Sequence, residues 1–419
     1  MIKCFARHFS WSRRRPVKCG DSHESNPVFT DQCPTGDDAA VKPTGSRSIR
    51  TALRTANVAA FLFSTAGAFF LLLPVYLQQR GNSPAQIGLV AGLLRASSLV
   101  ARPMGGYLLD RFGRRPIALA GAGLAIVAVL SLFVFPDLGA AFLAMRILQG
   151  IGTSLVDSGI GTLVADLSPP AARLQIFAFY TAWMNLAAAL MPGVGEAIAR
   201  RAGFPSLFGA AALALIGGLS VVRWLPETAP PRHEPATPVS GLARGAAPLL
   251  LGSVVVGLAY GVLSVFVPVA PIAAAPGRAG MYFFAYFLGL IGARLAGGLG
   301  LVRLAGPGVL LPAYTLLAVG LAALPLGGSA LLLLGVGLVC GVSHGVLMPV
   351  IYALLLVGVS RDRRGRAVTL LAAAFDLGNI LAALGLGLAA ESLGYPSIFV
   401  LAAGVVLLGA AVSHVWGRR

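Results

Sequence analysis

The stretch GGYLLDRFGRR occupies positions 105–115 and lies between two long apolar runs. Glycine permits sharp turns and close helix contacts, and an aspartate at a helix end can accept from basic groups or from the N-terminus of another helix. An ordinary basic loop needs the arginines but not the Gly-x4-Asp-x2-Gly spacing. The pattern therefore predicts a specialised polar connection between two helices, carried by Gly105, Gly106, Asp110, Arg111, Gly113, Arg114 and Arg115.

The composition around this stretch is that of a helical membrane protein. Hydrophobic residues make up 57% of the 419 residues and charged residues only 11%, with a mean hydropathy of +0.83. Ordinary soluble domains carry about a quarter charged residues. The composition excludes a soluble enzyme, a disordered protein and a disulfide scaffold. The net charge of +17 does not indicate nucleic-acid binding, because the basic residues sit in short gaps between apolar runs.

Twelve apolar spans follow one another from residue 54 onward, each long enough to cross a membrane as a tilted helix. We place them at 54–78, 85–109, 116–135, 138–165, 174–199, 203–225, 248–272, 279–302, 307–327, 329–357, 367–390 and 395–416. The predicted fold class is an all-α membrane protein with two six-helix bundles, 53–225 and 248–419. A Pro-rich cytoplasmic linker, 226–247, joins them, and the polar segment 1–52 is expected to be a disordered cytoplasmic extension.

Lys and Arg are distributed unequally between the two sides of these spans. With the N-terminus inside, twenty-four lie on the inner side and four on the outer side. The positive-inside rule therefore predicts that both termini are cytoplasmic. Cys4, Cys19 and Cys33 form no CxxC pair, so we expect no metal site, and no sequence feature indicates a cofactor.

The two halves of the chain resemble each other at an offset of about 191 residues. Residues 203–208, GFPSLF, match 394–399, GYPSIF, and Arg102 and Asn185 fall on Arg294 and Asp376. Parallel six-helix repeats of this kind are typical of transporters that alternate around a site near the membrane midplane.

The 105–115 stretch, the twelve spans, the central linker and the half-repeat together resemble the major facilitator superfamily over about residues 53–416. The resemblance implies a secondary transporter whose second and eleventh helices, and likewise the fifth and eighth, face each other across the interface between the halves. It also implies that Asp110 acts at the cytoplasmic gate.

The fourth span carries one polar stripe, Arg146, Gln149, Gly150, Thr153 and Asp157. These positions share a helical face, and a polar face in a membrane points toward protein or water. Arg-x2-Gln-Gly resembles the family's helix-four motif, which is associated with proton-coupled exporters. The alternative is a structural network within the first bundle. In the fifth span, Pro192-x2-Gly195 matches only part of the family's antiporter motif, so the direction of transport stays open.

His344 lies in the middle of the tenth span, where an intramembrane histidine can relay protons or bind substrate. The alternative is a neutral histidine bonded to Ser343 or to a carbonyl. The surrounding Gly-x-Ser-x-Gly pattern is inside an apolar helix and lacks the strand–turn–helix context of a hydrolase. We therefore predict that the protein is not an enzyme.

Repeat equivalence, together with the helix arrangement that the resemblance implies, leads to two expected contacts. We predict an ion pair between Arg102 and Asp376 and a hydrogen bond between Arg294 and Asn185. The alternative is that each arginine is satisfied within its own half.

The sequence thus predicts a plasma-membrane (inner-membrane) secondary transporter, a monomer in the lipid bilayer that exports a small molecule such as a drug, sugar or metabolite. A proton is the expected coupling ion. The residues expected to serve proton coupling in the central cavity are Arg146, Gln149, Gly150, Thr153, Asp157, His344 and Asp376. An importer or uniporter on the same fold is the first alternative. A membrane receptor or intramembrane enzyme is a distant one, because it would not need charged residues inside both halves.

Overall fold

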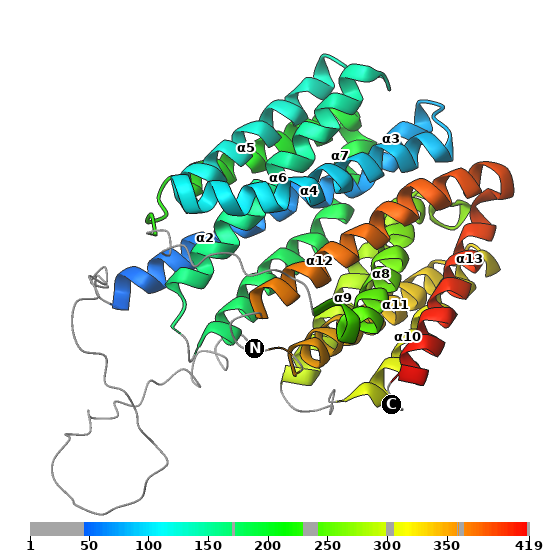
Figure 1. Cartoon of the computed structure of the whole chain (residues 1–419). Helices are drawn as coiled ribbons and strands as arrows, with labels where there is room; N and C mark the ends of the chain where they lie inside the picture. Colours follow the sequence, from blue (N-terminus) through cyan, green and yellow to red (C-terminus); the bar gives the residue numbers. More distant parts are fainter. Residues whose placement is uncertain are drawn as a thin grey trace, which may run out of the picture. The chain divides into compact units, whose positions relative to one another are not determined.

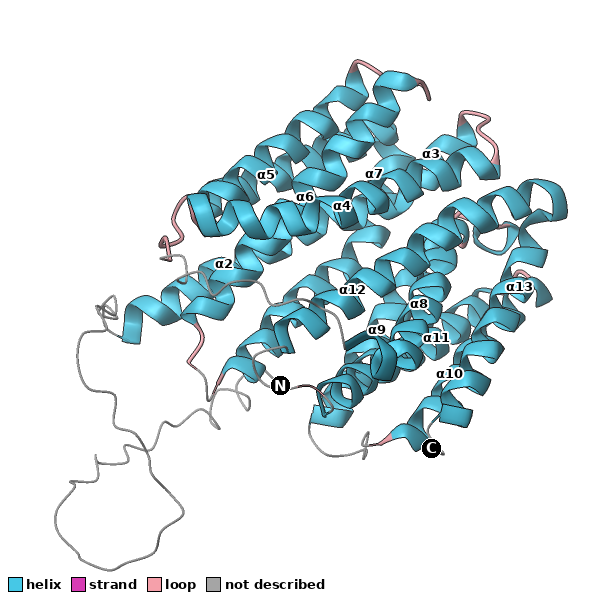
Figure 2. Ribbon diagram, in the orientation of Figure 1, coloured by secondary structure: helices cyan, strands magenta, loops and turns pink. Residues whose placement is uncertain are grey.

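Long helices joined by short turns make up the protein in a computed structural model (Figure 1). The structure describes residues 46–169, 172–228, 242–298, 306–357, 359 and 364–416, all within one unit, Thr44–Arg419. The described residues contain helices and turns but no strand (Figure 2). In a membrane only helices or closed barrels satisfy every backbone group.

The first half contains α2 (Ser46–Phe69), the 3-10 turn η1 (Phe70–Leu72), α3 (Leu73–Gln79), α4 (Pro84–Phe112), α5 (Arg114–Leu130), α6 (Ala140–Leu167) and α7 (Arg173–Val222). The second half contains α8 (Leu242–Phe266), α9 (Arg278–Gly298), α10 (Leu310–Ala323), α11 (Ala330–Val357), α12 (Arg364–Leu381), the π-helical turn η7 (Ala382–Leu386) and α13 (Gly387–Trp416).

Ten helices of the described chain are long and apolar enough to cross a membrane, and two of these cross it twice. Gln175–Val222 has 48 residues and Ala367–Val412 has 46, whereas one crossing needs about 20. Each long segment turns at a glycine with a positive φ, Gly203 at +81° and Gly394 at +78°. The described residues therefore make twelve crossings, which confirms the predicted fold class.

The internal repeat is visible in the backbone. Gly203 and Gly394 have the same conformation, each with ψ at 167°. Gly113 after α4 and Gly306 before α10 form a second matched pair, with φ values of +93° and +98°. Both turns use a backbone region that residues with a Cβ avoid, so glycine is required at equivalent places in the two halves.

Two predicted boundaries differ from the structure. α2 begins at Ser46, so residues 46–52, expected in the extension, are helical, and α8 begins at Leu242 inside the expected linker. Hydropathy marks only the apolar part of a helix. Polar first turns such as Ser46–Arg50 extend beyond it without any apolar signal.

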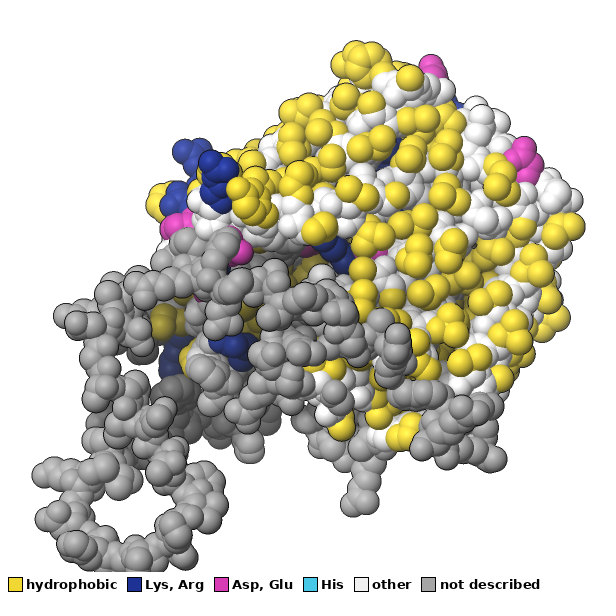
Figure 3. Space-filling view, in the orientation of Figure 1, with side chains coloured by type: hydrophobic (Ala, Val, Ile, Leu, Met, Phe, Trp, Pro, Cys, Tyr) yellow, Lys and Arg dark blue, Asp and Glu magenta, His cyan; other side chains and the backbone are white. Residues whose placement is uncertain are grey.

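Ser46 and Trp416 lie on the same side of the helices, which we call the terminus side (Figure 1). The turns at Gly203 and Gly394 and the start of α4 lie on the opposite side. The visible face of the helices is largely hydrophobic, and basic side chains gather near the start of α5 on the terminus side (Figure 3).

The two halves contact each other mainly on the opposite side. There α4 packs against η7 and α13, and α7 packs against α9. A Cβ at Gly88 of α4 would lie 2.0 Å from the carbonyl oxygen of Ala383 in η7, and one at Gly280 of α9 would lie 2.5 Å from the Cα of Gly193 in α7. Small residues thus let both pairs of helices touch backbone to backbone.

Polar contacts strengthen the same junction. Gln78 donates to the Val269 carbonyl at 3.0 Å, and the Ser83 hydroxyl donates to Glu391 Oε2 at 3.2 Å. Glu196 accepts from the backbone N–H groups of Gly277 and Gly280. Farther along α4 toward the terminus side, an ion pair between Arg102 and Asp376 of α12 also joins the halves. The halves are thus joined by backbone-to-backbone packing on the opposite side and by the contact of α4 with α12 deeper in the helices.

Candidate functional site

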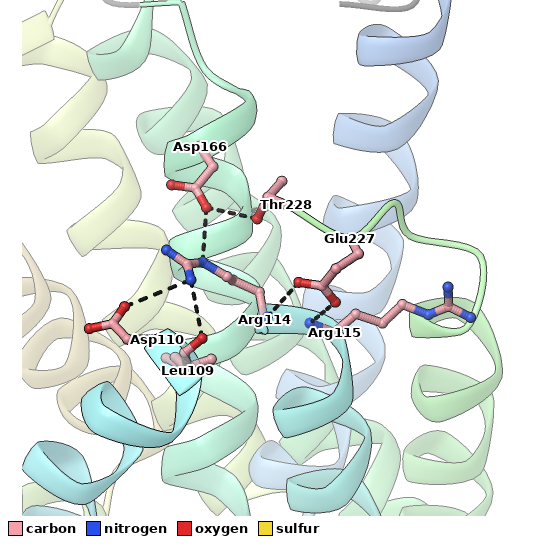
Figure 4. A network of polar contacts seen from close by, with 7 residues as sticks. All are labelled: Leu109, Asp110, Arg114, Arg115, Asp166, Glu227 and Thr228. Atoms are coloured by element: carbon pink, nitrogen blue, oxygen red, sulfur yellow. Dashed lines mark hydrogen bonds and ion pairs between the residues drawn. The ribbon is translucent and has the colours of Figure 1, made fainter. Parts of the chain in front are cut away.

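The 105–115 stretch forms the end of α4, a turn at Gly113 and the start of α5 (Figure 4). α4 starts at a capping box, in which Ser83 and Gln86 each bond the other's backbone, and it ends at Gly113. A Cβ at Gly113 would lie 2.7 Å from Glu227 Oε1. Both the φ of +93° and the nearby carboxylate therefore require glycine at this position.

Arg114 is the centre of a buried ionic network, with a side chain that is only 1% exposed. Its Nε donates to Asp166 Oδ2 at 3.1 Å and its Nη1 to the Leu109 carbonyl at 3.1 Å, while Asp110 Oδ1 lies 3.7 Å away. Thr228 also donates to Asp166, at 2.7 Å. A buried arginine needs such partners, so the network fastens the ends of α4, α5 and α6 together.

Glu227 caps the start of α5 from the segment after α7. Its two carboxylate oxygens accept from the backbone N–H groups of Arg114 at 2.7 Å and Arg115 at 3.0 Å (Figure 4). A carboxylate at a helix N-terminus satisfies free N–H groups and interacts favourably with the helix dipole. Asp110, expected to act at the cytoplasmic gate, here forms an ion pair with Arg114 of its own half.

The remaining residues of the stretch are peripheral. A Cβ at Gly105 would lie 3.3 Å from Leu155 Cδ2 of α6, so this glycine does lie at a close helix contact. Gly106 is exposed with open space around it, so it does not lie at a close helix contact within the protein. Arg111 is exposed and donates to the Tyr107 hydroxyl at 3.2 Å.

The polar stripe of α6 divides into a buried part and an open part. Arg146 and Gln149 are buried and hydrogen-bonded to each other, and the Arg146 guanidinium lies 5.3 Å from the centroid of the Phe70 ring. Gly150 packs against α4, where a Cβ would lie 2.3 Å from the Leu94 carbonyl oxygen, and Thr153 bonds the backbone of its own helix. These four residues fit the structural alternative, a network within the first half.

Asp157, the last member of the stripe, is exposed. It interacts electrostatically with Arg102, Arg95 and Asp376, and its charge also acts on Tyr180 of α7. Because Asp376 belongs to the other half, Asp157 lies within electrostatic range of that half. It accepts no hydrogen bond from the described residues and forms no ion pair with them.

Arg102 and Asp376 form an ion pair between the halves, with 2.7 Å between Nη1 and Oδ2. The Asp376 side chain is 5% exposed and that of Arg102 is 32% exposed. Asp376 also interacts electrostatically with Arg95. This contact lies where the repeat places it, far along α4 from the junction on the opposite side.

The second contact predicted from the repeat is absent: no hydrogen bond joins Arg294 and Asn185 among the described residues. Arg294 interacts instead with Tyr286, Tyr352 and His344 of its own half. An amide carries no charge to attract a guanidinium across the interface, whereas Asp376 does. Arg294 therefore follows the alternative in which the arginine stays within its half.

His344 is buried, and its Nδ1 is hydrogen-bonded to the Tyr286 hydroxyl. Ser343, the partner considered from sequence, bonds the Val339 carbonyl of its own helix. The rings of Tyr260 and Phe375 lie 5.6 Å from the His344 ring, between centroids. His344 is thus the centre of an aromatic cluster built from α8, α9, α11 and α12.

Known proteins agree with this architecture. The family model of the Major Facilitator Superfamily matches residues 55–270 and 249–419. The chain belongs to the major facilitator superfamily. Human organic anion transporter MFSD10 has a similar structure, with a TM-score of 0.64 and 20% identity over 87% of this chain and 99% of that one. Nucleoside transporter NupG has a TM-score of 0.70 and 14% identity, with the same coverage.

Sequence relatives cover only a part of the chain. Quinolone resistance protein NorA of Staphylococcus aureus is 29% identical over 134 residues, 32% of this chain and 34% of its own. Methylenomycin A resistance protein of Bacillus subtilis is 36% identical over 126 residues, 28% of this chain and 26% of its own. The match to these relatives thus spans about a third of their length or less. As a superfamily member the chain is a multi-pass membrane transport protein.

Sequence reasoning missed three participants in these sites. Asp166 and Glu227 complete the Arg114 network, and Tyr286 holds His344. Asp166 is a carboxylate at the terminus-side end of a span, and Glu227 follows Pro226 at the end of another, so each carried a weak signal. No group of three or more metal-ligating side chains occurs in the described part of the chain.

Proposed function

We propose that the protein is a proton-coupled exporter of a small molecule and that it works by alternating access. One observation carries the proposal: ionisable residues of both halves come together at Arg102, Asp157 and Asp376, in the interior of the helices. Charged groups inside a membrane are costly and mark ion or substrate pathways. The resistance proteins among the relatives support the direction of export.

Orientation and assembly belong to the same proposal. The protein lies in the plasma membrane as a monomer with both termini cytoplasmic, so the terminus side is the cytoplasmic side. The bundles 53–225 and 248–419 and the linker 226–247 are its functional parts. The conformation seen here then faces the cytoplasm, the state in which an exporter takes up its substrate.

Asp157 is the proton carrier in this mechanism. It is exposed, it lies within electrostatic range of the other half, and the positive charges of Arg95 and Arg102 act on it. The protonation of a carboxylate depends on the charges near it, so a conformational change that moves those charges can make it bind or release a proton. Asp157→Asn should abolish transport driven by a pH gradient but leave exchange of substrate across the membrane without a gradient. Unchanged gradient-driven transport would remove Asp157 from the mechanism.

Asp110 serves the cytoplasmic gate when the halves close on the terminus side. In the present conformation it lies at the edge of the Arg114 network, free to turn toward the N-terminus of α12. Asp110→Asn should slow turnover with little loss of folded protein. A transport rate equal to that of the unaltered protein would exclude the gate role.

Everted membrane vesicles test the proposal as a whole. With an imposed inside-acid gradient, vesicles with the protein should accumulate a substrate from a panel, and a protonophore should abolish accumulation. Uptake into intact cells instead would support an importer, for which the similarity to a nucleoside transporter is the relevant observation. Transport that ignores the gradient would overturn proton coupling and indicate a uniporter.

A further inference from the structure

The ionised groups between the halves lie at one level of the membrane. Arg102 is eighteen residues into α4, Asp157 seventeen into α6 and Arg294 sixteen into α9, each counted from its opposite-side end. At 1.5 Å per residue these positions lie about 24–27 Å from that end. Asp376 joins the same layer through its ion pair with Arg102.

The interior of the described helices as a whole carries more positive than negative charge. The interior cations of the described helices are Arg95, Arg102, Arg146 and Arg294, and the interior anions are Asp157 and Asp376. Arg95 and Arg102 each interact electrostatically with both carboxylates. Arg146 lies nearer the opposite side, beside Gln149 and the Phe70 ring. Two positive charges are thus left unbalanced, and an unbalanced charge is costly in a medium of low dielectric constant.

Arg294 is the least balanced of these cations. The groups that act on it, Tyr286 and Tyr352, are neutral phenols, and His344 is its third neighbour. Its buried Nε has no hydrogen-bond partner, and no described residue bonds its Nη groups. The residue as a whole is only partly buried. A guanidinium with free N–H groups is suited to a carboxylate or another planar oxyanion.

An aromatic wall adjoins Arg294. Tyr260 and Phe375 lie 5.8 Å apart between centroids, and both flank His344. Both rings are partly exposed, whereas the interior of a packed bundle would bury them. Arg95 of the first half acts electrostatically on Tyr260, so this wall lies within electrostatic range of the other half. An exposed ring of this kind offers stacking surface to a flat apolar ligand.

We propose that the substrate is an aromatic organic anion whose negative group binds Arg294 and whose ring lies against Tyr260 and Phe375. The bound anion neutralises part of the excess positive charge and supplies the acceptor that Arg294 lacks. This assignment rests on the proposed export function for its physiological role. The binding site itself is independent of the direction of transport and of the coupling ion.

Binding to the purified full-length protein in detergent tests the assignment with three ligands that share one ring system. These are 1-naphthoate, 1-naphthylmethanol and 1-naphthylmethylammonium, measured by isothermal titration calorimetry at pH 7. Naphthoate should bind at least tenfold more tightly than the alcohol, and the ammonium compound most weakly. A hydrogen bond to a charged group contributes about 1.5–3 kcal/mol, equivalent to about a tenfold to hundredfold change in affinity.

Variants locate the site. Arg294→Gln should reduce naphthoate affinity about tenfold or more and leave the alcohol unchanged, and Arg294→Lys should retain part of the preference. Tyr260→Ala should weaken all three ligands. Arg80→Gln is the matched control, because it removes a positive charge at an exposed ion pair with Asp137. The preference for naphthoate over the alcohol is measured within each variant, so a general loss of folded protein does not imitate the expected result.

Three results would overturn the assignment. One is equal or tighter binding of the ammonium compound, and another is an unchanged naphthoate preference in Arg294→Gln. The third is complete competition by chloride at equal concentration, which would indicate a site for small inorganic anions. If naphthoate binds as expected but vesicles do not export it, the export proposal fails and the anion site stands. If another solute is exported and naphthoate does not bind, the anion site fails and the export proposal stands.

Discussion

Replacing Arg102 with Gln should destabilise the folded protein by about 3 kcal/mol, because it leaves a buried carboxylate without its partner. The Asp376 side chain is 5% exposed and Oδ2 lies 2.7 Å from Arg102 Nη1. Two charges with centres about 4 Å apart interact by about 4 kcal/mol at an effective dielectric constant of 20. Losing one partner of a buried pair costs about 3–5 kcal/mol. Arg102 is 32% exposed, which places the expected cost at the low end.

Replacing the other partner, Asp376, should reduce the free energy of unfolding by less. Asp376→Asn leaves Arg102 with partial access to water, so about 1 kcal/mol is expected for a charge that can be hydrated. Equilibrium unfolding in mixed detergent and SDS micelles measures both variants and the double variant. The double variant should be less destabilised than the two single changes combined, by at least about 1 kcal/mol.

The exposed pair of Arg80 and Asp137 provides the control, since its side chains are 42% and 79% exposed. Arg80→Gln should change the free energy of unfolding by less than about 1 kcal/mol. If Arg102→Gln costs no more than Arg80→Gln, or if the double variant shows no coupling, the pair does not join the halves energetically.

Three further changes test other contacts. Gly113→Ala should lower the free energy of unfolding by about 2 kcal/mol or more, because φ is +93° and the new Cβ would meet Glu227. Gly306→Ala, with φ at +98° but open space around it, should cost less. Equal costs in the two variants would contradict the contact with Glu227. Glu227→Ala should cost about 1 kcal/mol in the same unfolding measurement by removing the cap of α5, and an unaltered stability would show that the cap is dispensable. Gly88→Ala should force α4 away from Ala383 and so raise the rate at which a thiol reagent labels a cysteine placed on the opposite side of the interface. Gly106→Ala, with open space around it, should not change this rate. Equal labelling rates in both variants would refute the close approach of α4 to Ala383.

The sequence was sufficient for the crossings and for the pairing of the halves. Span length is set by membrane thickness, so apolar runs predicted all twelve crossings. The matched turns at Gly203 and Gly394 appeared as a repeated Gly-x-Pro-Ser pattern. The expected meeting of Arg102 with Asp376 required the repeat together with the family's helix arrangement, because nothing local to either residue indicates the other.

Contacts between distant polar residues were harder to anticipate. Glu227 lies more than a hundred positions from Arg114, and only the folded first half brings it to the start of α5. His344 had more than one potential partner, and Tyr286, its partner in the structure, lies 58 positions away in the chain. Arg294 and Asn185 show the limit of repeat symmetry: equivalent backbone positions need not make equivalent contacts when one side chain is charged and the other is not.

Distances across the two sides of the interface test alternating access most directly. In a variant whose four native cysteines are replaced, spin labels at Trp224 and Val357 report on the terminus side, and labels at Val134 and Leu326 on the opposite side; all four positions are exposed. Pulsed electron paramagnetic resonance in lipid nanodiscs would be recorded at high and low pH, with and without substrate. The account predicts that the first distance shortens when the second lengthens. Two distances that stay fixed in every condition, or that change in the same direction, would contradict it.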